Sequence, residues 1–141
     1  MNYLLDTCVV SELTKPRPNS KVLAWLKDRD EVTMFLSVLT LGEIQKGIST
    51  LGEVRRKGAV QHWLDVELPK QFAERILPIS EEIALAWGRI QGETERRGYP
   101  VPTIDGLLGA TAVTHNLTVV TRDVEGIQRT GARIANPWQS V

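Results

Sequence analysis

The stretch YLLDTCVVSE, residues 3–12, joins a short apolar run to one carboxylate and then to a second apolar run. Residues 3–5 predict a buried strand, and residues 7–15 predict a helix that ends at the prolines in positions 16 and 18. We expect a strand this close to the first residue to be central in its sheet, because no earlier segment would cover an exposed edge. Asp6 would then stand at the carboxyl end of a central strand.

Strands and helices alternate along the rest of the chain. Strand-like segments cover residues 33–38, 75–79, 117–121 and 132–136, and helical stripes cover residues 19–29, 40–51, 80–98 and 103–116. The expected helix signals are Asn19 or Ser20 as the first cap, Ser80 as a later cap, Gly98 as a helix end and Pro69 as a kink or break within residues 53–75. We therefore predict an α/β fold in a single domain over residues 1–141. Its central, mainly parallel sheet should have about 4–5 strands flanked by helices.

The composition is that of an ordinary globular chain and disfavours several classes of protein. Seventeen basic residues balance 17 acidic ones, so bulk charge does not point to nucleic acid, although a zero total can hide an acidic pocket. Cys8 is the single cysteine, so no internal disulfide forms, which fits a reducing cytoplasm. The first residues lack the features of a signal peptide, and no apolar run is long enough to span a membrane. We therefore expect a cytoplasmic protein that does not associate with a membrane.

Four acidic residues are expected at one edge of the predicted sheet. Asp6 and Asp123 stand at or just after strand ends, and Glu43 and Asp105 lie early in helices that follow a strand or a loop. Ligands of open parallel sheets bind at the carboxyl ends of the strands. Four carboxylates in one cleft would raise one another's pKa values unless divalent cations neutralise them. Oxygen ligands alone favour Mg²⁺ or Mn²⁺ over zinc, and two scattered histidines with one cysteine are too few for a zinc site.

Each acid also has a simpler explanation as a helix-capping residue. These explanations are an N-cap for Asp6, a capping box with Thr40 for Glu43, a first-turn acid after a Thr103 cap for Asp105, and a cap of residues 123–126 for Asp123. Capping accounts for each position separately, but it does not explain why all four acids are expected at one end of the sheet.

Two threonines and the cysteine lie beside these acids. The hydroxyls of Thr7 and Thr121 are candidates to orient a carboxylate or a metal-bound water, whereas a threonine at a strand end is the simpler explanation, and for Thr7 the favoured one. Cys8 is expected to pack rather than to act as a nucleophile, because no histidine lies near it in the sequence. Basic residues at 55–57, 96 and 97 are expected on solvated helix faces.

Four ordered motifs resemble the PIN-domain family. They are LLDTCVVSE at residues 4–12, GEIQKG at 42–47, TIDGLLGATAVTHNLTVVTRD at 103–123 and NPW at 136–138. The chain is most similar to the VapC/FitB-type toxin ribonucleases of bacterial type II toxin–antitoxin pairs, over residues 3–138. Asp6, Glu43, Asp105 and Asp123 match the four acids of that family, and Thr121 matches its usual serine or threonine. Cys8 departs from the pattern, since the family often has asparagine there.

The resemblance implies a Mg²⁺- or Mn²⁺-dependent endoribonuclease. It also implies a homodimer and a cognate antitoxin that blocks the acidic pocket. In the mechanism that we expect, Asp6 and Asp105 hold the principal metal ion, with Glu43 and Asp123 helping directly or through water. A carboxylate, with Glu43 as the candidate, would orient or deprotonate the attacking water, so that no protein nucleophile is required.

Three other functions are compatible with parts of this pattern. A catalytically weak PIN-like module that only binds RNA or a partner would normally lose one or more of the acids, yet all four are present. A phosphate-accepting receiver domain would need a second acid after the first strand, where Thr7 stands. A metal-dependent DNA 5′-nuclease shares the acidic pocket but is expected to be a longer chain.

Overall fold

Five parallel strands form one sheet in the computed structural model, which describes residues 1–52 and 54–139. The strand order is β3-β2-β1-β4-β5, so the first strand is central and the sheet is entirely parallel, as the sequence predicts. Leu4 lies opposite Phe35 on one neighbour and Val119 on the other. The strands are β1 (Tyr3–Leu5), β2 (Met34–Ser37), β3 (Ile76–Leu77), β4 (Thr118–Val120) and β5 (Arg133–Ala135).

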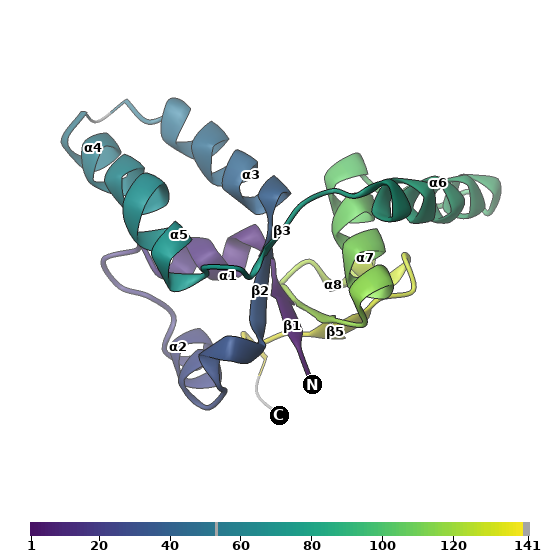
Figure 1. The fold of residues 1–141 in the computed structure, drawn as a ribbon, viewed down its shortest axis with the longest axis horizontal. Coiled ribbons are helices and arrows are strands. Elements are labelled where there is room, and N and C mark those ends of the chain that lie inside the picture. The colour runs from purple at the N-terminus through teal and green to yellow at the C-terminus, as the bar shows by residue number, and fades with distance from the viewer. Residues whose placement is uncertain (53, 140–141) are drawn as a thin grey trace.

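Helices cover both faces of the sheet, with α1 to α5 on one side and α6 and α7 on the other (Figure 1). The helix α6 extends away from the sheet and packs mainly along α7. The helical elements are α1 (Thr7–Glu12), α2 (Ser20–Lys27), η1 (Glu31–Thr33), α3 (Val38–Ser49), α4 (Val54–His62), η2 (Trp63–Glu67), α5 (Leu68–Gln71), α6 (Glu81–Arg96), α7 (Thr103–His115) and α8 (Val124–Gln128). None of the described helices has both the length and the apolar character that crossing a membrane requires.

The alternation of side chains along β1 divides the core into two halves. Leu5 packs with the helices that follow β1 and β2, in a cluster that includes Val9, Ile48 and Phe72. Leu4 points to the opposite face, where it packs with residues such as Leu108 of α7. Both leucines are at most 1% exposed. A short strand with both faces buried is therefore held rigidly, and so is the residue that follows it.

Local signals in the sequence place several helix ends. The Asn19 side chain accepts hydrogen bonds from the backbone of Lys21 and Val22, and Ser80 accepts one from Ile83. Gly98 has a φ of +82°, in the left-handed region that ends helices. These three predictions are confirmed.

The segment that follows α3 differs in detail from the prediction for residues 53–75. It continues from α4 through the π-helical η2 into α5, so the interruption expected at Pro69 is a π-helical segment rather than a gap between helices. Pro69 has no N–H to donate to the carbonyl of Asp65, and the π-helical turns lie immediately before it. Residue 53 lies outside the described residues.

Candidate active site

The carboxyl edge of the sheet gathers the four acids that the sequence singles out. Asp6 directly follows β1, and Asp123 follows β4 after a two-residue interval. Glu43 lies in α3, which begins where β2 ends, and Asp105 lies in the first turn of α7. Parallel pairing puts the ends of β1, β2 and β4 side by side, which brings these elements to one edge.

Asp6 is a buried carboxylate whose two oxygens have separate partners. Its Oδ1 accepts a hydrogen bond from the backbone N–H of Thr7 at 2.7 Å, which is the capping role that the sequence allowed. Its Oδ2 accepts a hydrogen bond from the hydroxyl of Thr121 at 2.7 Å. The side chain is 8% exposed. Capping therefore explains one oxygen, and the other is oriented by a residue 115 positions later in the chain.

Glu43 is linked to Asp6 through Thr7. The Thr7 hydroxyl donates a hydrogen bond to Glu43 Oε1 at 2.6 Å. The proposed capping box of Thr40 and Glu43 is wrong, because α3 begins earlier, with Ser37 as its cap, and Thr40 lies inside the helix. The hydrogen bond also explains Thr7 better than a strand-end preference does.

Asp105 and Asp123 are neighbours, because oxygens of both carboxyl groups lie beside Gly126. Asp105 lies in the first turn of α7 as expected, but the cap position is Pro102 and not Thr103. Asp123 occupies the cap position of α8, yet its side chain makes no capping hydrogen bond. Both side chains are therefore available to the site rather than used by the helix ends.

The crowding of negative charge raises the pKa of Asp105 to about 7. Burial is the largest cause, followed by the hydrogen bond and the charge of Asp123 and by the charges of Asp6 and Glu43. The Asp105 carboxyl therefore lies close enough to the other three acids to respond to their charges.

Thr121 connects the two halves of the site. Its hydroxyl donates to Asp6, as above, and accepts a hydrogen bond from the backbone N–H of Asp123 at 2.9 Å. The residue is fully buried. A fixed hydroxyl between the ends of β1 and β4 therefore sets the position of Asp6 relative to Asp123.

The side chains of the site offer oxygen ligands, which are the type that a hard divalent cation prefers. The cluster consists of carboxylate oxygens and hydroxyls, and its excess negative charge is what such an ion would offset. Their present arrangement is not closed around an ion, since within residues 1–52 and 54–139 no group of three acidic, histidine or cysteine side chains is placed to hold one. Metal binding would therefore require the carboxylates to move.

Cys8 lies beside the site with a protonated thiol. Its Sγ is 3.7 Å from Asp6 Oδ2 and 3.9 Å from Thr121 Oγ1. Burial, and then the charge of Asp6, raises the pKa of the thiol above its ordinary value. A thiol held in this form is a poor nucleophile, which agrees with the packing role expected from the sequence.

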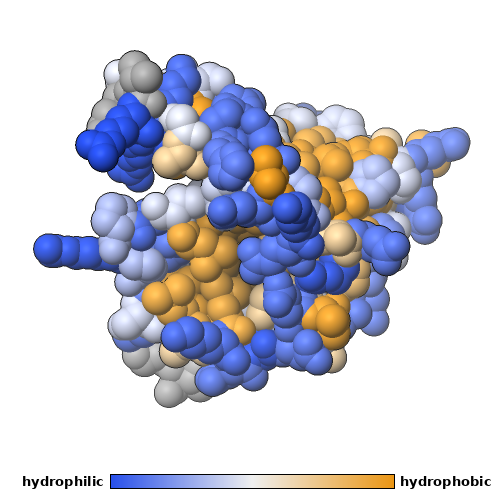
Figure 2. Space-filling view, turned by 60° about the vertical axis from the view of Figure 1, so that its left-hand side comes forward, coloured by the Kyte–Doolittle hydropathy of each residue, from blue (hydrophilic) through white to orange (hydrophobic). Residues whose placement is uncertain are grey.

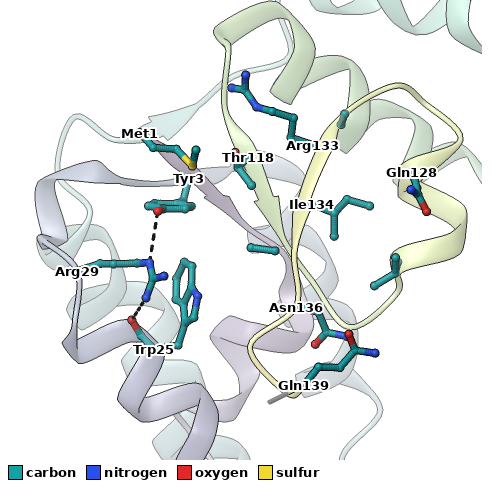
Figure 3. Close-up of a pocket in the computed structure, with 13 residues that line it drawn as sticks. Met1, Tyr3, Trp25, Arg29, Thr118, Gln128, Arg133, Ile134, Asn136 and Gln139 are labelled. Carbon is teal, nitrogen blue, oxygen red and sulfur yellow. Dashed lines mark hydrogen bonds between the residues drawn. The ribbon is translucent and has the colours of Figure 1, made fainter. Parts of the chain in front are cut away.

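One hollow adjoins the cluster of carboxylates, and a larger one lies away from it. One of about 200 Å³ lies between α1 and α3, and its lining includes Thr7, Glu43 and Trp63. A larger one of about 650 Å³ lies beside Tyr3 and Trp25, with Arg29 and Ile134 in its lining (Figure 3). Sequence reasoning identified neither hollow, because each is formed by residues from several distant segments. It also overlooked Gly126, which faces two of the carboxylates from α8.

Known proteins share this fold and much of this sequence. The PIN domain family matches residues 3–132. Toxin FitB of Neisseria gonorrhoeae is 35% identical over 135 residues, which cover 96% of this chain and 97% of FitB. VapC ribonuclease Y4jK of Sinorhizobium fredii is 32% identical, over 96% of this chain and 97% of its own. The solved structure of FitAB bound to the IR36 DNA fragment contains a chain with 32% identity and a TM-score of 0.91, covering 99% of this chain and 97% of that one.

Proposed function

This chain belongs to the PIN-domain family, and from that membership we propose that it is a metal-dependent endoribonuclease and the toxin of a type II toxin–antitoxin pair. The observation that carries the proposal is the convergence of Asp6, Glu43, Asp105 and Asp123 at the carboxyl edge of the sheet. The names of two relatives, a toxin and a ribonuclease, support it.

The proposed roles follow from the contacts of each side chain. Asp6 and Asp105 would hold a Mg²⁺ or Mn²⁺ ion, with Asp123 and Glu43 contributing directly or through water. When bound, such an ion supplies an acidified water and offsets the negative charge that develops on the phosphate. Thr121 keeps Asp6 in place, and Thr7 fixes one oxygen of Glu43. The other Glu43 oxygen would accept a proton from the attacking water.

The proposed partner is a cognate antitoxin, with RNA as the substrate and a homodimer as the assembly. The relative named as toxin FitB and the solved FitAB structure support a two-component system. The surface is of a kind that partners cover, because apolar patches interrupt the polar residues on the face shown in Figure 2. The exposed large apolar residues include Val38, Leu85, Tyr99 and Val113. A cytoplasmic location belongs to the same proposal.

One observation favours a second candidate, a PIN-like module that binds RNA or a partner without cleaving it. Among the described residues, no three potential ligands are placed to hold a metal ion. If the carboxylates do not rearrange, the acidic cluster would serve only to receive a basic group of a partner.

Cleavage of a structured RNA by the purified chain distinguishes the two candidates. We expect cleavage with Mg²⁺ or Mn²⁺ and none with EDTA, and we expect Asp105→Asn to remove it while RNA binding persists. RNA binding without cleavage under every metal condition would overturn the nuclease proposal in favour of the binding module.

A further inference from the structure

Gly126 lies within α8 and faces the carboxyl groups of Asp105 and Asp123. A Cβ atom built on Gly126 would lie 3.3 Å from Asp123 Oδ2, 3.4 Å from Asp105 Oδ2 and 3.5 Å from Asp123 Oδ1. The three nearest atoms are therefore all carboxylate oxygens. They come from two different elements, the first turn of α7 and the residue that precedes α8.

The backbone does not require glycine at this position. Gly126 is not among the residues with a positive φ, in contrast to Gly98 at +82° and Gly131 at +90°. A glycine inside a helix costs about 1 kcal/mol relative to alanine. The advantage of Gly126 must therefore lie in the side chain that it lacks.

Two other helix glycines show what different roles look like. A Cβ on Gly109 would lie 2.5 Å from Thr130 Cβ and 2.6 Å from Thr130 Cγ2, so Gly109 allows a close packing contact. A Cβ on Gly92 would have no neighbour within 4 Å. Gly126 belongs to neither kind, because its neighbours are at the distance of a tight contact and are all oxygens of the site.

The space between Gly126 and the two carboxyl groups is needed if those groups turn to bind a metal ion. Asp105 Oδ2 and both carboxyl oxygens of Asp123 lie together beside Gly126, and as arranged these residues and the neighbouring described ones do not form a three-ligand metal site. For both groups to ligate one cation together with a third ligand, their oxygens must turn from their present directions. A methyl group at position 126 would restrict that turn, since two of the oxygens already lie within 3.4 Å of it.

We infer that Gly126 is a positioning residue, whose missing side chain leaves the space in which the neighbouring carboxyl groups of Asp105 and Asp123 turn to become ligands of a divalent cation. This inference rests on the proposed function. It assigns α8 a part in metal binding through its backbone, although none of its own side chains is a ligand.

The test compares three alanine variants of the full chain by Mn²⁺ binding, measured by electron paramagnetic resonance, and by thermal unfolding. For Gly126→Ala we expect about tenfold weaker Mn²⁺ binding, as for loss of an outer-shell partner. We expect no loss of stability, because alanine favours the helix. Gly92→Ala should leave Mn²⁺ binding unchanged and raise the unfolding temperature, because alanine favours the helix there as well, whereas Gly109→Ala should lower the unfolding temperature.

Cleavage assays provide the second readout. Gly126→Ala should need about tenfold more Mn²⁺ for half-maximal cleavage but approach the wild-type rate at saturating metal. Gly126→Leu, which fills more of the space, should need still more.

Two outcomes would overturn the inference while the proposed function stands. One is Mn²⁺ binding by Gly126→Ala and Gly126→Leu within twofold of a wild-type chain that cleaves RNA. The other is destabilisation of Gly126→Ala as severe as that of Gly109→Ala, which would assign Gly126 to packing. A wild-type chain that neither binds Mn²⁺ nor cleaves RNA would overturn both.

Discussion

The two ends of β1 differ in the charges around them. At the carboxyl end, Asp6 lies near three other acidic side chains. At the amino end, Tyr3 lines a hollow whose charged side chains are arginines. The acidic end has a carboxyl group with a pKa raised to about 7 by burial and by its neighbours. The hollow at the other end, of about 650 Å³, is lined by Arg29 and Arg133 and, among the described residues, by no acidic side chain. One strand of three residues therefore separates two regions of opposite charge.

The Arg29 guanidinium at the amino end already has stacking and hydrogen-bonding partners. The Arg29 guanidinium stacks at 3.7 Å from the ring centroid of Trp25. It also donates hydrogen bonds to the Trp25 carbonyl at 2.9 Å and to the Tyr3 hydroxyl at 3.3 Å, drawn as dashed lines in Figure 3. The carboxylates at the other end repel one another instead. The comparison teaches that like charges crowded together identify the candidate site here, and that the volume of a hollow does not.

Removing one charge from the acidic end should have the largest effect on activity. Asp6→Asn keeps an oxygen to accept the Thr7 N–H but loses the carboxylate. Loss of an outer-shell partner lowers activity by up to about 100-fold, and loss of a direct ligand should cost more, so RNA cleavage with Mg²⁺ should fall by at least about 100-fold. Initial cleavage rates measure the loss, and circular dichroism checks that the fold is retained. Full activity in a folded variant would contradict the metal-site assignment.

The hydroxyl that orients Asp6 comes second in the expected size of its effect. Thr121→Val keeps the shape of the side chain but leaves Asp6 Oδ2 and the Asp123 N–H without their shared partner. We expect metal affinity or cleavage to fall by about 10- to 100-fold. Thr121→Ser restores the hydroxyl and is the matched control. Equal rates for the valine and serine variants would show that the hydroxyl has no orienting role.

The crowding at the acidic end should also appear as a dependence of stability on pH. The pKa of Asp105 is about 7 in the folded chain and near 3.8 when unperturbed, so the folded state retains a proton that the unfolded state loses between these values. Stability from this group is complete below pH 3.8 and falls as pH rises towards 7.

Asp105→Asn should remove this dependence. Above pH 7 in EDTA the variant should be more stable than the wild type by on the order of 1–2 kcal/mol, a figure that allows for solvent screening of a half-buried group. Urea unfolding at several pH values measures the difference. Parallel stability curves for the two chains would show that the carboxyl groups are not coupled.

A substitution at the amino end of β1 should lower stability and leave cleavage unchanged, the opposite of what we expect for Asp6→Asn. Arg29→Met removes the stacking on Trp25 and two hydrogen bonds, so we expect a loss of about 1 kcal/mol in the free energy of unfolding and an unchanged cleavage rate. Chemical unfolding and initial rates measure the two quantities separately. A large loss of cleavage at full stability would place RNA in the hollow and reverse the comparison.

The smallest effect is expected at Cys8. The thiol is protonated, and its sulfur makes only weak, long contacts with Asp6 and Thr121. The cleavage rate of Cys8→Ala should therefore stay within about threefold of the wild-type rate, which corresponds to about 0.6 kcal/mol. The same limit should hold for Cys8→Asn, which restores the residue common in the family. An inactive but folded Cys8→Ala variant would point to a thiol mechanism.

Much of the fold follows from patterns within short segments. The apolar run at 3–5, the caps Asn19 and Ser80, and Gly98 at a helix end are local signals, and the structure contains all of them. Two capping predictions failed. Thr40 and Thr103 each carry the chemistry of a cap, but neighbouring residues, Ser37 and Pro102, take the positions. A cap depends on where the helix meets the preceding strand or loop, which a short sequence window does not define.

The sequence by itself determined that Asp6, Glu43, Asp105 and Asp123 would meet, because the carboxyl ends of parallel strands reach one edge of a sheet. It also identified Thr121 as a neighbour of the last acid. Only the tertiary structure decided how these groups contact one another: the Thr7 hydroxyl reaches Glu43 across 36 positions, and the Asp105 carboxyl lies next to that of Asp123. It alone placed Gly126 against both carboxyl groups. Such contacts depend on the distance and rotation between packed helices, which are set by side-chain packing over the whole core rather than by the pattern of any one segment.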